Sequence, residues 1–402
     1  MQLGWIDFSK TERSKVLSVL DLLQEKGTLD ELGIAPVRDG FANRFFPGTS
    51  TIQTRAKYFL IIPYAFKELE RSGETNLSLL TKALSALEKS CGEAFLVQNY
   101  KEQGVIGSVS LKNGGWVKRP PSDVYWAGLK RYGVFLYNDL SIKECLRYIA
   151  QFTAEKGNTV KLGNRNDNAE EHECDDRDAG GSRRIQFWNI PTYDKDWMLE
   201  LSMSLKSNEA KFLKSRIIEN CKGSMMEFIL KNNMTEVLEC NSFADLEGII
   251  HKFPDYMQRD YYLALDFSHF MYVLRVLYNV IISDAQNTEA NKELELLRDD
   301  FAEYAGVDLN AIIETLGIGT NKMLVNFLYQ AQSYMSKSDI EGLTKCIRDR
   351  EIFLKGESRA KTNHAGEFPL DVWFGGRYLD YRFYNARIII RDIFEGEVSQ
   401  YA

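Results

Sequence analysis

The stretch YYLALDFSHFMYVLRVLYNVIISD, residues 261–284, is the longest apolar run of the chain. Asp266, His269 and Arg275 interrupt it, so it does not supply the roughly 20 predominantly apolar residues that a membrane-spanning helix needs. A helix that is apolar on nearly every side and carries a few polar residues is typical of a large protein core. The stretch therefore predicts a mainly α-helical protein with a substantial core and no membrane segment.

Helical periodicity continues on both sides of this core helix. Apolar spacing predicts helices over about 76–91, 140–152, 207–221, 223–231, 241–251, 256–283, 287–305, 321–335, 338–355 and 380–394. Near the N-terminus, capping boxes predict two further helices that end at Gly27 and Gly33, and residues 34–48 are expected to form a loop.

Another helix start is expected in RFFPGTSTIQTRAKYFLIIPY, residues 44–64. Ser50 is the expected N-cap and Gln53 the residue that completes its capping box. The core-facing side would comprise Ile52, Ala56, Phe59 and Leu60. This arrangement accounts for the helix but not for Arg55 and Lys57, which could be solvated, pair with buried carboxylates, or begin an anion-binding face.

The segment from residue 104 to 133 has a different character. Its first part, 104–120, is expected to contain short extended pieces around an Asn113-Gly114 turn, a small β or winged element between helices.

From these patterns we expect an α-helical, multi-domain chain. Its parts are a basic N-terminal helical domain (1–154), for which a winged-helix-like module is one reading, a polar flexible loop (155–184) and a C-terminal helical domain (185–402).

Charge is distributed unevenly along the chain. The net charge is -7, yet residues 41–131 contain thirteen Lys and Arg against seven Asp and Glu, a net of +6. This asymmetry favours an anionic partner for the N-terminal third. It is equally consistent with a basic third that docks on the acidic remainder of the chain or on an acidic protein.

Cations beside aromatic residues are typical of nucleic-acid interfaces, where cations contact phosphates and rings stack on bases. The same pattern arises when long cationic side chains cover the edge of a core. The candidate nucleic-acid-binding residues are Arg55, Lys57, Lys118, Arg119, Tyr125, Trp126, Lys130 and Arg131.

Catalytic and metal-binding patterns are absent from the sequence. No phosphate-binding loop, dinucleotide fingerprint, nucleophile elbow or zinc-protease motif occurs, and no cofactor is expected. The six cysteines have no regular spacing and suit the reduced thiols of a cytoplasmic protein. A nuclease with an unrecognised metal site stays open as an alternative, with Asp7, Asp123 and Asp380 as candidate acids.

The sequence resembles an uncharacterised bacterial family known only as a domain of unknown function. The resemblance rests on the opening Gly4-Trp5-Ile6-Asp7-Phe8-Ser9, the block at 45–63 and the block at 104–133, with weaker elements further along, such as LDYR at 379–382. It implies a setting in anti-phage defence gene clusters, beside helicase and phospholipase-D-like nuclease genes. It also implies a non-catalytic accessory subunit that binds DNA or bridges those enzymes. A protein-protein scaffold that does not bind nucleic acid is the rival hypothesis.

Overall fold

The computed structural model describes residues 30–98, 104–163, 186–194 and 196–398, and the structural statements below refer to these residues. They form α-helices and short 3-10 helices, with no β-strand among them; Phe135 and Trp188 make an isolated antiparallel bridge. The mainly α-helical prediction is therefore confirmed. The first predicted helix, which ends at Gly27, lies outside the described residues. The short second helix, expected to end at Gly33, is wrong over its described part, since residues 30–34 form a turn.

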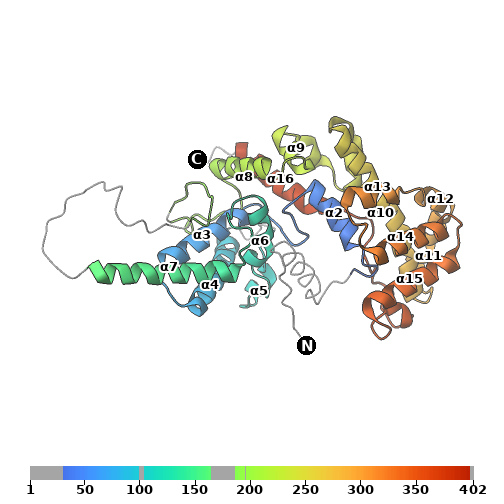
Figure 1. Cartoon of the computed structure of the whole chain (residues 1–402), viewed down its shortest axis with the longest axis horizontal. Coiled ribbons are helices and arrows are strands. Elements are labelled where there is room, and N and C mark those ends of the chain that lie inside the picture. Colours follow the sequence, from blue (N-terminus) through green and yellow to red (C-terminus); the bar gives the residue numbers. More distant parts are fainter. Residues whose placement is uncertain (1–29, 99–103, 164–185, 195, 399–402) are drawn as a thin grey trace, which may run out of the picture. The chain divides into compact units, whose positions relative to one another are not determined.

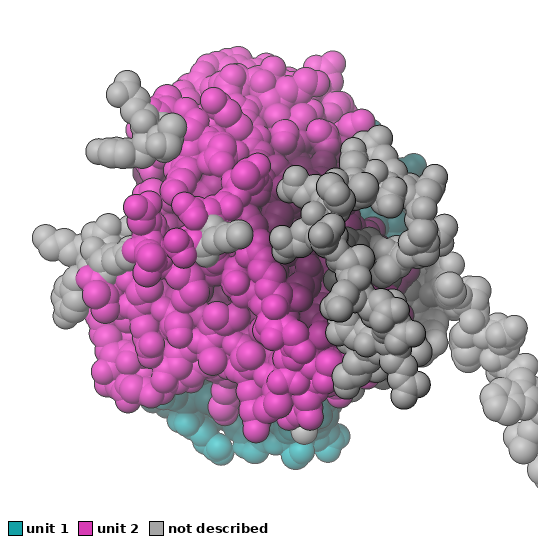
Figure 2. Space-filling view, turned by 90° about the vertical axis from the view of Figure 1, so that its left-hand side faces the viewer, with its two compact units in different colours: residues 1–41, 259–379 teal, residues 42–258, 380–402 magenta. Residues whose placement is uncertain are grey.

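The chain divides into two compact units, and each unit is assembled from two separate segments. Unit 1 comprises Met1–Phe41 and Arg259–Leu379, and unit 2 comprises Ala42–Gln258 and Asp380–Ala402 (Figure 2). The units do not follow the linear order 1–154, 155–184 and 185–402, because the last helix of the chain packs within unit 2. Helices α2 (Ala35–Phe45) and α10 (Asp255–Ile282) each contain residues assigned to both units.

Unit 2 contains two groups of packed helices. In the first group, α3 packs against α4, α6 and α7, and these helices lie side by side (Figure 1). In the second, α16 packs against α8 and α9. The bounds are α3 Tyr58–Arg71, α4 Leu77–Gln98, α5 Ser108–Lys112, α6 Pro121–Arg131, α7 Ile142–Gly163, α8 Ser207–Asn220, α9 Met225–Lys231, η1 Thr235–Glu239, η2 Ala244–Gly248, η3 Ile250–Lys252 and α16 Phe383–Val398.

Aromatic side chains hold the first group together. The ring of Phe59 on α3 lies 4.8 Å from that of Tyr125 on α6 and 4.9 Å from that of Tyr132, and all three residues are fully buried. Trp126 contacts Phe135 with ring centroids 4.5 Å apart. Large buried rings dominate core energetics, so these contacts hold α3 and α6 together.

Unit 1 is built around α10, the helix that the apolar stretch 261–284 predicts. Despite Asp266, His269 and Arg275, its length and composition would suffice to cross a membrane, so this part of the sequence-based prediction is wrong. However, 78% of its most apolar window is buried inside the protein, as expected of a core helix. The other elements are α11 Thr288–Leu297, η4 Arg298–Asp300, α12 Phe301–Tyr304, α13 Leu309–Leu316, α14 Lys322–Met335, α15 Ile340–Lys355 and η5 Lys361–Asn363.

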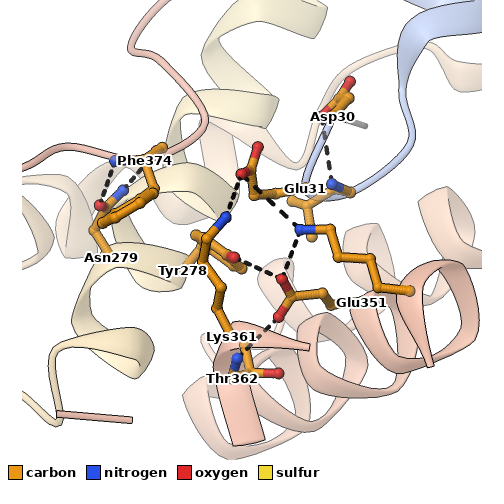
Figure 3. A network of polar contacts seen from close by, with 10 residues as sticks. Asp30, Glu31, Tyr278, Asn279, Glu351, Lys361, Thr362 and Phe374 are labelled. Carbon is orange, nitrogen blue, oxygen red and sulfur yellow. Dashed lines mark hydrogen bonds and ion pairs between the residues drawn. The ribbon is translucent and has the colours of Figure 1, made fainter. Parts of the chain in front are cut away.

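A buried polar network ties the N-terminal segment of unit 1 to its helices (Figure 3). The carboxylate of Glu351, which is completely buried, accepts hydrogen bonds from Tyr278 Oη at 2.7 Å, Lys355 Nζ at 2.8 Å and the Thr362 backbone N–H at 3.0 Å. Glu31 in turn accepts one from Lys361 Nζ at 2.9 Å. Lys355 Nζ also lies 3.9 Å from Glu31 Oε1, which links the two carboxylates. Since the buried Glu351 carboxylate is both paired with a cation and hydrogen-bonded, we assign the network a structural role.

Several predicted segments differ from the structure. The helix expected at 241–251 is replaced by the 3-10 helices η2 and η3. Residues 34–48 contain α2 rather than a loop, and α13 was not expected. The β or winged element expected at 104–120 is wrong, since this segment carries the short helix α5 followed by turns. Helix α7 continues to Gly163, past the boundary expected at residue 154.

Candidate nucleic-acid interface

The eight candidate residues occupy two environments within unit 2. Lys57, Tyr125 and Trp126 are buried, and Arg55 is partly buried with its side chain 19% exposed. Lys118, Arg119 and Arg131 are exposed, and Lys130 is partly buried. The structure therefore does not bring the eight side chains together on one surface.

Arg55 pairs with a buried carboxylate at the other end of the chain. Its Nε donates to both oxygens of Asp392, at 3.0 and 2.9 Å, and the Asp392 side chain on α16 is 3% exposed. The backbone N–H of Ala56 donates to the same carboxylate at 2.8 Å. Burial raises the pKa of Asp392, and the Arg55 guanidinium opposes that rise. Arg55 thus stabilises a buried anion that belongs to the protein itself.

The predicted helix start at Ser50 is wrong, because the α-helix begins at Tyr58. Side chains take the backbone N–H groups that an earlier helix would use: Tyr125 Oη accepts from Thr54 N at 2.8 Å and from Arg55 N at 3.0 Å. Gln53 does bond back to Ser50 N at 3.2 Å, but within a turn. Ile52, expected on the core face, is 42% exposed as a result.

Lys57 also pairs inside the protein. Its Nζ lies 2.6 Å from Oε2 of Glu209 on α8, and the two side chains are only 5% and 6% exposed. Glu209 Oε2 accepts a second hydrogen bond, from the Lys206 backbone N–H at 2.8 Å. A buried charge is stable only when it is paired and hydrogen-bonded, so each of these residues depends on the other.

The two candidate aromatic residues lie in the core of unit 2. Burial raises the pKa of Tyr125 to about 12, so its hydroxyl is neutral and donates to the Arg55 carbonyl at 2.9 Å. Trp126 Nε1 donates to the Leu140 carbonyl at 3.0 Å. Neither ring is available for base stacking in this conformation.

The exposed candidates lie at the two ends of α6. Lys118 and Arg119 precede its first residue, Pro121, in a segment that begins with the Gly114 and Gly115 turn. Lys130 and Arg131 form its last turn, where Lys130 Nζ donates to the Asn138 carbonyl at 2.8 Å. Burial lowers the pKa of Lys130, and Asp139 and Glu144 oppose this effect.

Beside the Lys57–Glu209 pair lies a pocket of about 550 Å3, which we call the Glu209 pocket. Tyr64 and Tyr193 stack in its wall with ring centroids 4.2 Å apart, and Trp197 meets Tyr64 edge-on at 5.5 Å. The lining consists of Lys57, Tyr64, Thr192, Tyr193, Asp194, Trp197, Glu200, Leu201, Lys206, Ser207, Asn208 and Glu209.

Two of the candidate acids of the nuclease alternative lie in the part of the chain that the structure describes. Asp123 is exposed, and Asp380 accepts from the Tyr384 backbone N–H at 2.8 Å near the start of α16; Asp7 lies outside the described residues. Across the part of the chain that the structure describes, no group of three His, Cys, Asp or Glu side chains is placed to hold a metal ion.

Residues 1–150 match the model of a family described as a family of unknown function (DUF6361). A search of curated proteins and a search of solved structures each found no match. The matched range agrees with the resemblance of the N-terminal sequence to an uncharacterised family, and it contains all eight candidate residues.

Sequence reasoning did not identify the carboxylates that neutralise the interior cations, nor the Glu209 pocket. Asp392 is separated from Arg55 by 337 residues and Glu209 from Lys57 by 152. The one available signal was the capping box at the start of α8, in which Glu209 returns to the Lys206 backbone N–H. The capping box predicts the start of a helix, but it does not indicate that Lys57 pairs with Glu209.

Proposed function

We propose that this chain binds nucleic acid through phosphate contacts made by the exposed cations at the two ends of α6, namely Lys118, Arg119 and Arg131, with Lys130 beside them. The observation that carries the proposal is the composition and exposure of one segment. Residues 104–133 contain five Lys and Arg against a single Asp, in a chain whose net charge is -7. Such a local basic surface is the electrostatic footprint of phosphate binding.

The separation of the two cation pairs suits an extended polyanion. Helix α6 has 11 residues, so its ends lie about 15 Å apart at 1.5 Å per residue. Along one strand of B-form DNA this distance covers about four nucleotides at 3.4 Å each. Both ends of α6 can therefore reach the same strand.

The interior position of Tyr125 and Trp126 limits the proposal to the phosphate backbone. Contacts of this kind position a protein on nucleic acid without reading its sequence. Affinity that depends on salt and not on base composition is expected.

The role we propose is that of a non-catalytic accessory subunit in bacterial anti-phage defence. It would bridge nucleic acid to a helicase or a phospholipase-D-like nuclease, as the family resemblance implies.

A protein-protein scaffold is the second candidate, and a specific observation favours it. Two cations of the basic third, Arg55 and Lys57, are neutralised by carboxylates of the acidic remainder, Asp392 and Glu209. If the exposed cations likewise meet an acidic protein, the chain will co-purify with the products of neighbouring genes and will not bind nucleic acid.

The test is fluorescence anisotropy with labelled duplex and single-stranded DNA over a salt series. The double variant Lys118→Ala/Arg119→Ala is compared with Lys222→Ala/Lys231→Ala, which removes the same charge from exposed positions of unit 2. We expect the first variant to reduce the slope of log K against log salt by about two, and the control to leave it unchanged. Absence of binding by the unmodified chain, or equal losses in both variants, would overturn the proposal.

A further inference from the structure

The Glu209 pocket is a second candidate site, and the phosphate contacts proposed above make no use of it. We propose that it binds a small, neutral, planar nitrogen heterocycle of the nucleobase class, with N–H groups that donate to Glu209. This inference concerns residues separate from the exposed cations, so it stands or falls independently of the nucleic-acid proposal.

The dimensions and walls of the pocket fit a small planar ligand. Its volume of about 550 Å3 lies within the usual range for small-molecule sites, about 300–1,000 Å3. Tyr64 and Trp197 are buried, Tyr193 stacks on Tyr64, and Leu201 completes the apolar part of the lining. Aromatic walls bind flat rings well because ring–ring contacts add to the burial of apolar area.

The buried carboxylate supplies the polar recognition. Glu209 Oε2 accepts from Lys57 Nζ and from the Lys206 backbone N–H, whereas Oε1 has the longer contact of 3.4 Å with Tyr64 Oη. A carboxylate has about four lone-pair positions. Glu209 therefore has acceptor capacity for N–H groups of a ligand, and hydrogen bonds to an ionised acceptor are the stronger kind.

The charges of the lining disfavour an anion, and the one net negative charge that they offer a cation lies on the exposed Asp194 and Glu200 rather than on the buried Glu209. Lys57 already neutralises Glu209, so an organic cation would gain little attraction there. An anion would meet three carboxylates, those of Asp194, Glu200 and Glu209, against the two lysines of the lining. A neutral ring that carries adjacent N–H donors gains the hydrogen bonds and the ring contacts without either cost.

The test is isothermal titration calorimetry of the full chain with adenosine, guanosine, cytidine and uridine, with choline and inorganic phosphate as charged controls. We expect at least one nucleoside to bind and both controls to fail. Thr192→Trp, at an exposed lining position, fills the mouth without altering the ion pair and is expected to abolish binding. Lys211→Trp on the exposed side of α8 is the matched control and should bind as the unmodified chain does.

Glu209→Gln is expected to weaken binding by about tenfold, as loss of a charged acceptor does. Its folded fraction is checked by thermal melting because the change leaves Lys57 as a buried, uncompensated charge. A short single-stranded oligonucleotide is added as a competitor: displacement of the nucleoside identifies a base within a strand as the ligand, and no displacement identifies a free nucleoside. Failure of all four nucleosides to bind, or equal binding by Thr192→Trp, would overturn the inference.

Discussion

At the scale of single residues, the main finding concerns two cations whose role the sequence left open. Arg55 and Lys57 each meet a carboxylate that is almost completely buried, Asp392 and Glu209. Removing one partner of a buried ion pair lowers the free energy of unfolding by more than the intact pair contributes to it, because the remaining charge is left in a poorly solvated site. Both cations are therefore expected to contribute to the stability of unit 2.

Arg55→Ala is expected to lower the free energy of unfolding by about 3 kcal/mol, because Asp392 keeps only its backbone donor. Urea denaturation followed by circular dichroism measures this change. Lys118→Ala removes an exposed cation of the same charge and should change the value by less than about 0.5 kcal/mol. Equal stability of the two variants would show that the Arg55 pair contributes nothing.

The sequence shows that helix formation does not account for Arg55 and Lys57. It does not show whether these cations are solvated, pair with buried carboxylates or bind an external anion. Their partners lie 337 and 152 residues away, and no local pattern links positions so distant. Of the three readings that the residues allowed, pairing with buried carboxylates is the one that the described structure contains.

At the scale of elements, α6 depends on a contact from α4. The side chain of Glu88, which is 5% exposed, accepts from the Ser122 backbone N–H at 2.6 Å in the first turn of α6. Burial raises the pKa of Glu88 from 4.5 to about 7, and the hydrogen bond from Ser122 opposes the rise. Glu88 therefore takes up a proton on folding at mildly acidic pH.

Stability should consequently fall as pH increases from about 4.5 to about 7, the interval in which folded Glu88 holds a proton that the unfolded chain has lost. The loss amounts to roughly 3 kcal/mol at most. Glu88→Gln should flatten this part of the profile of unfolding free energy against pH, whereas Glu93→Gln, an exposed residue of the same helix, should not. An unchanged profile for Glu88→Gln would refute the assignment.

The close approach of α6 to the chain before α3 gives a second element-scale prediction. A Cβ atom at Gly128 would lie 2.5 Å from the Gly48 carbonyl oxygen and 2.7 Å from Cε1 of Phe59. Gly128→Ala gains about 1 kcal/mol of helix propensity but forces these groups apart, which costs about 1–3 kcal/mol. We expect a lower melting temperature, with Ala127→Ser as the exposed control. A higher melting temperature would contradict this packing.

Most elements were predictable from periodicity, and the exceptions have physical causes. Helices such as α10, α14 and α15 match their predicted ranges closely because long apolar patterns define them. The start of α3 was misplaced because Tyr125 and Asp392, both distant in sequence, bind backbone N–H groups at residues 54–56. The β element at 104–120 was wrong because its Gly-rich turns follow the short helix α5 rather than connecting strands.

At the scale of the whole molecule, each compact unit draws on two distant segments. Residues 380–402 belong to the unit that begins at residue 42, because α16 packs against α8 and Asp392 forms an ion pair with Arg55. Sequence analysis places domain boundaries where the composition changes along the chain. It could not predict that each unit would combine two separate segments. The C-terminal helix is thus part of the same unit as the proposed nucleic-acid surface.

This arrangement predicts that truncation before α16 destabilises the unit that carries the basic segment. A chain ending at residue 379 loses Asp392 and the packing partner of α8, so unit 2 should melt at a lower temperature or fail to fold. Limited proteolysis with mass spectrometry would show new cleavages within helices α3, α6 and α8 in the truncated chain that the full chain does not show. Equal protection in both chains would mean that α16 is dispensable for unit 2.

The basic N-terminal third contains two kinds of cation: Arg55 and Lys57 pair with buried carboxylates, and Lys118, Arg119 and Arg131 are the exposed cations for which we propose phosphate contacts. The most direct test measures melting temperature and DNA anisotropy on Arg55→Ala and on Lys118→Ala/Arg119→Ala. We predict that Arg55→Ala melts at a lower temperature yet binds DNA normally while folded. The double variant should melt normally and bind about tenfold more weakly at moderate salt. Weaker DNA binding by a fully stable Arg55→Ala protein would contradict the account.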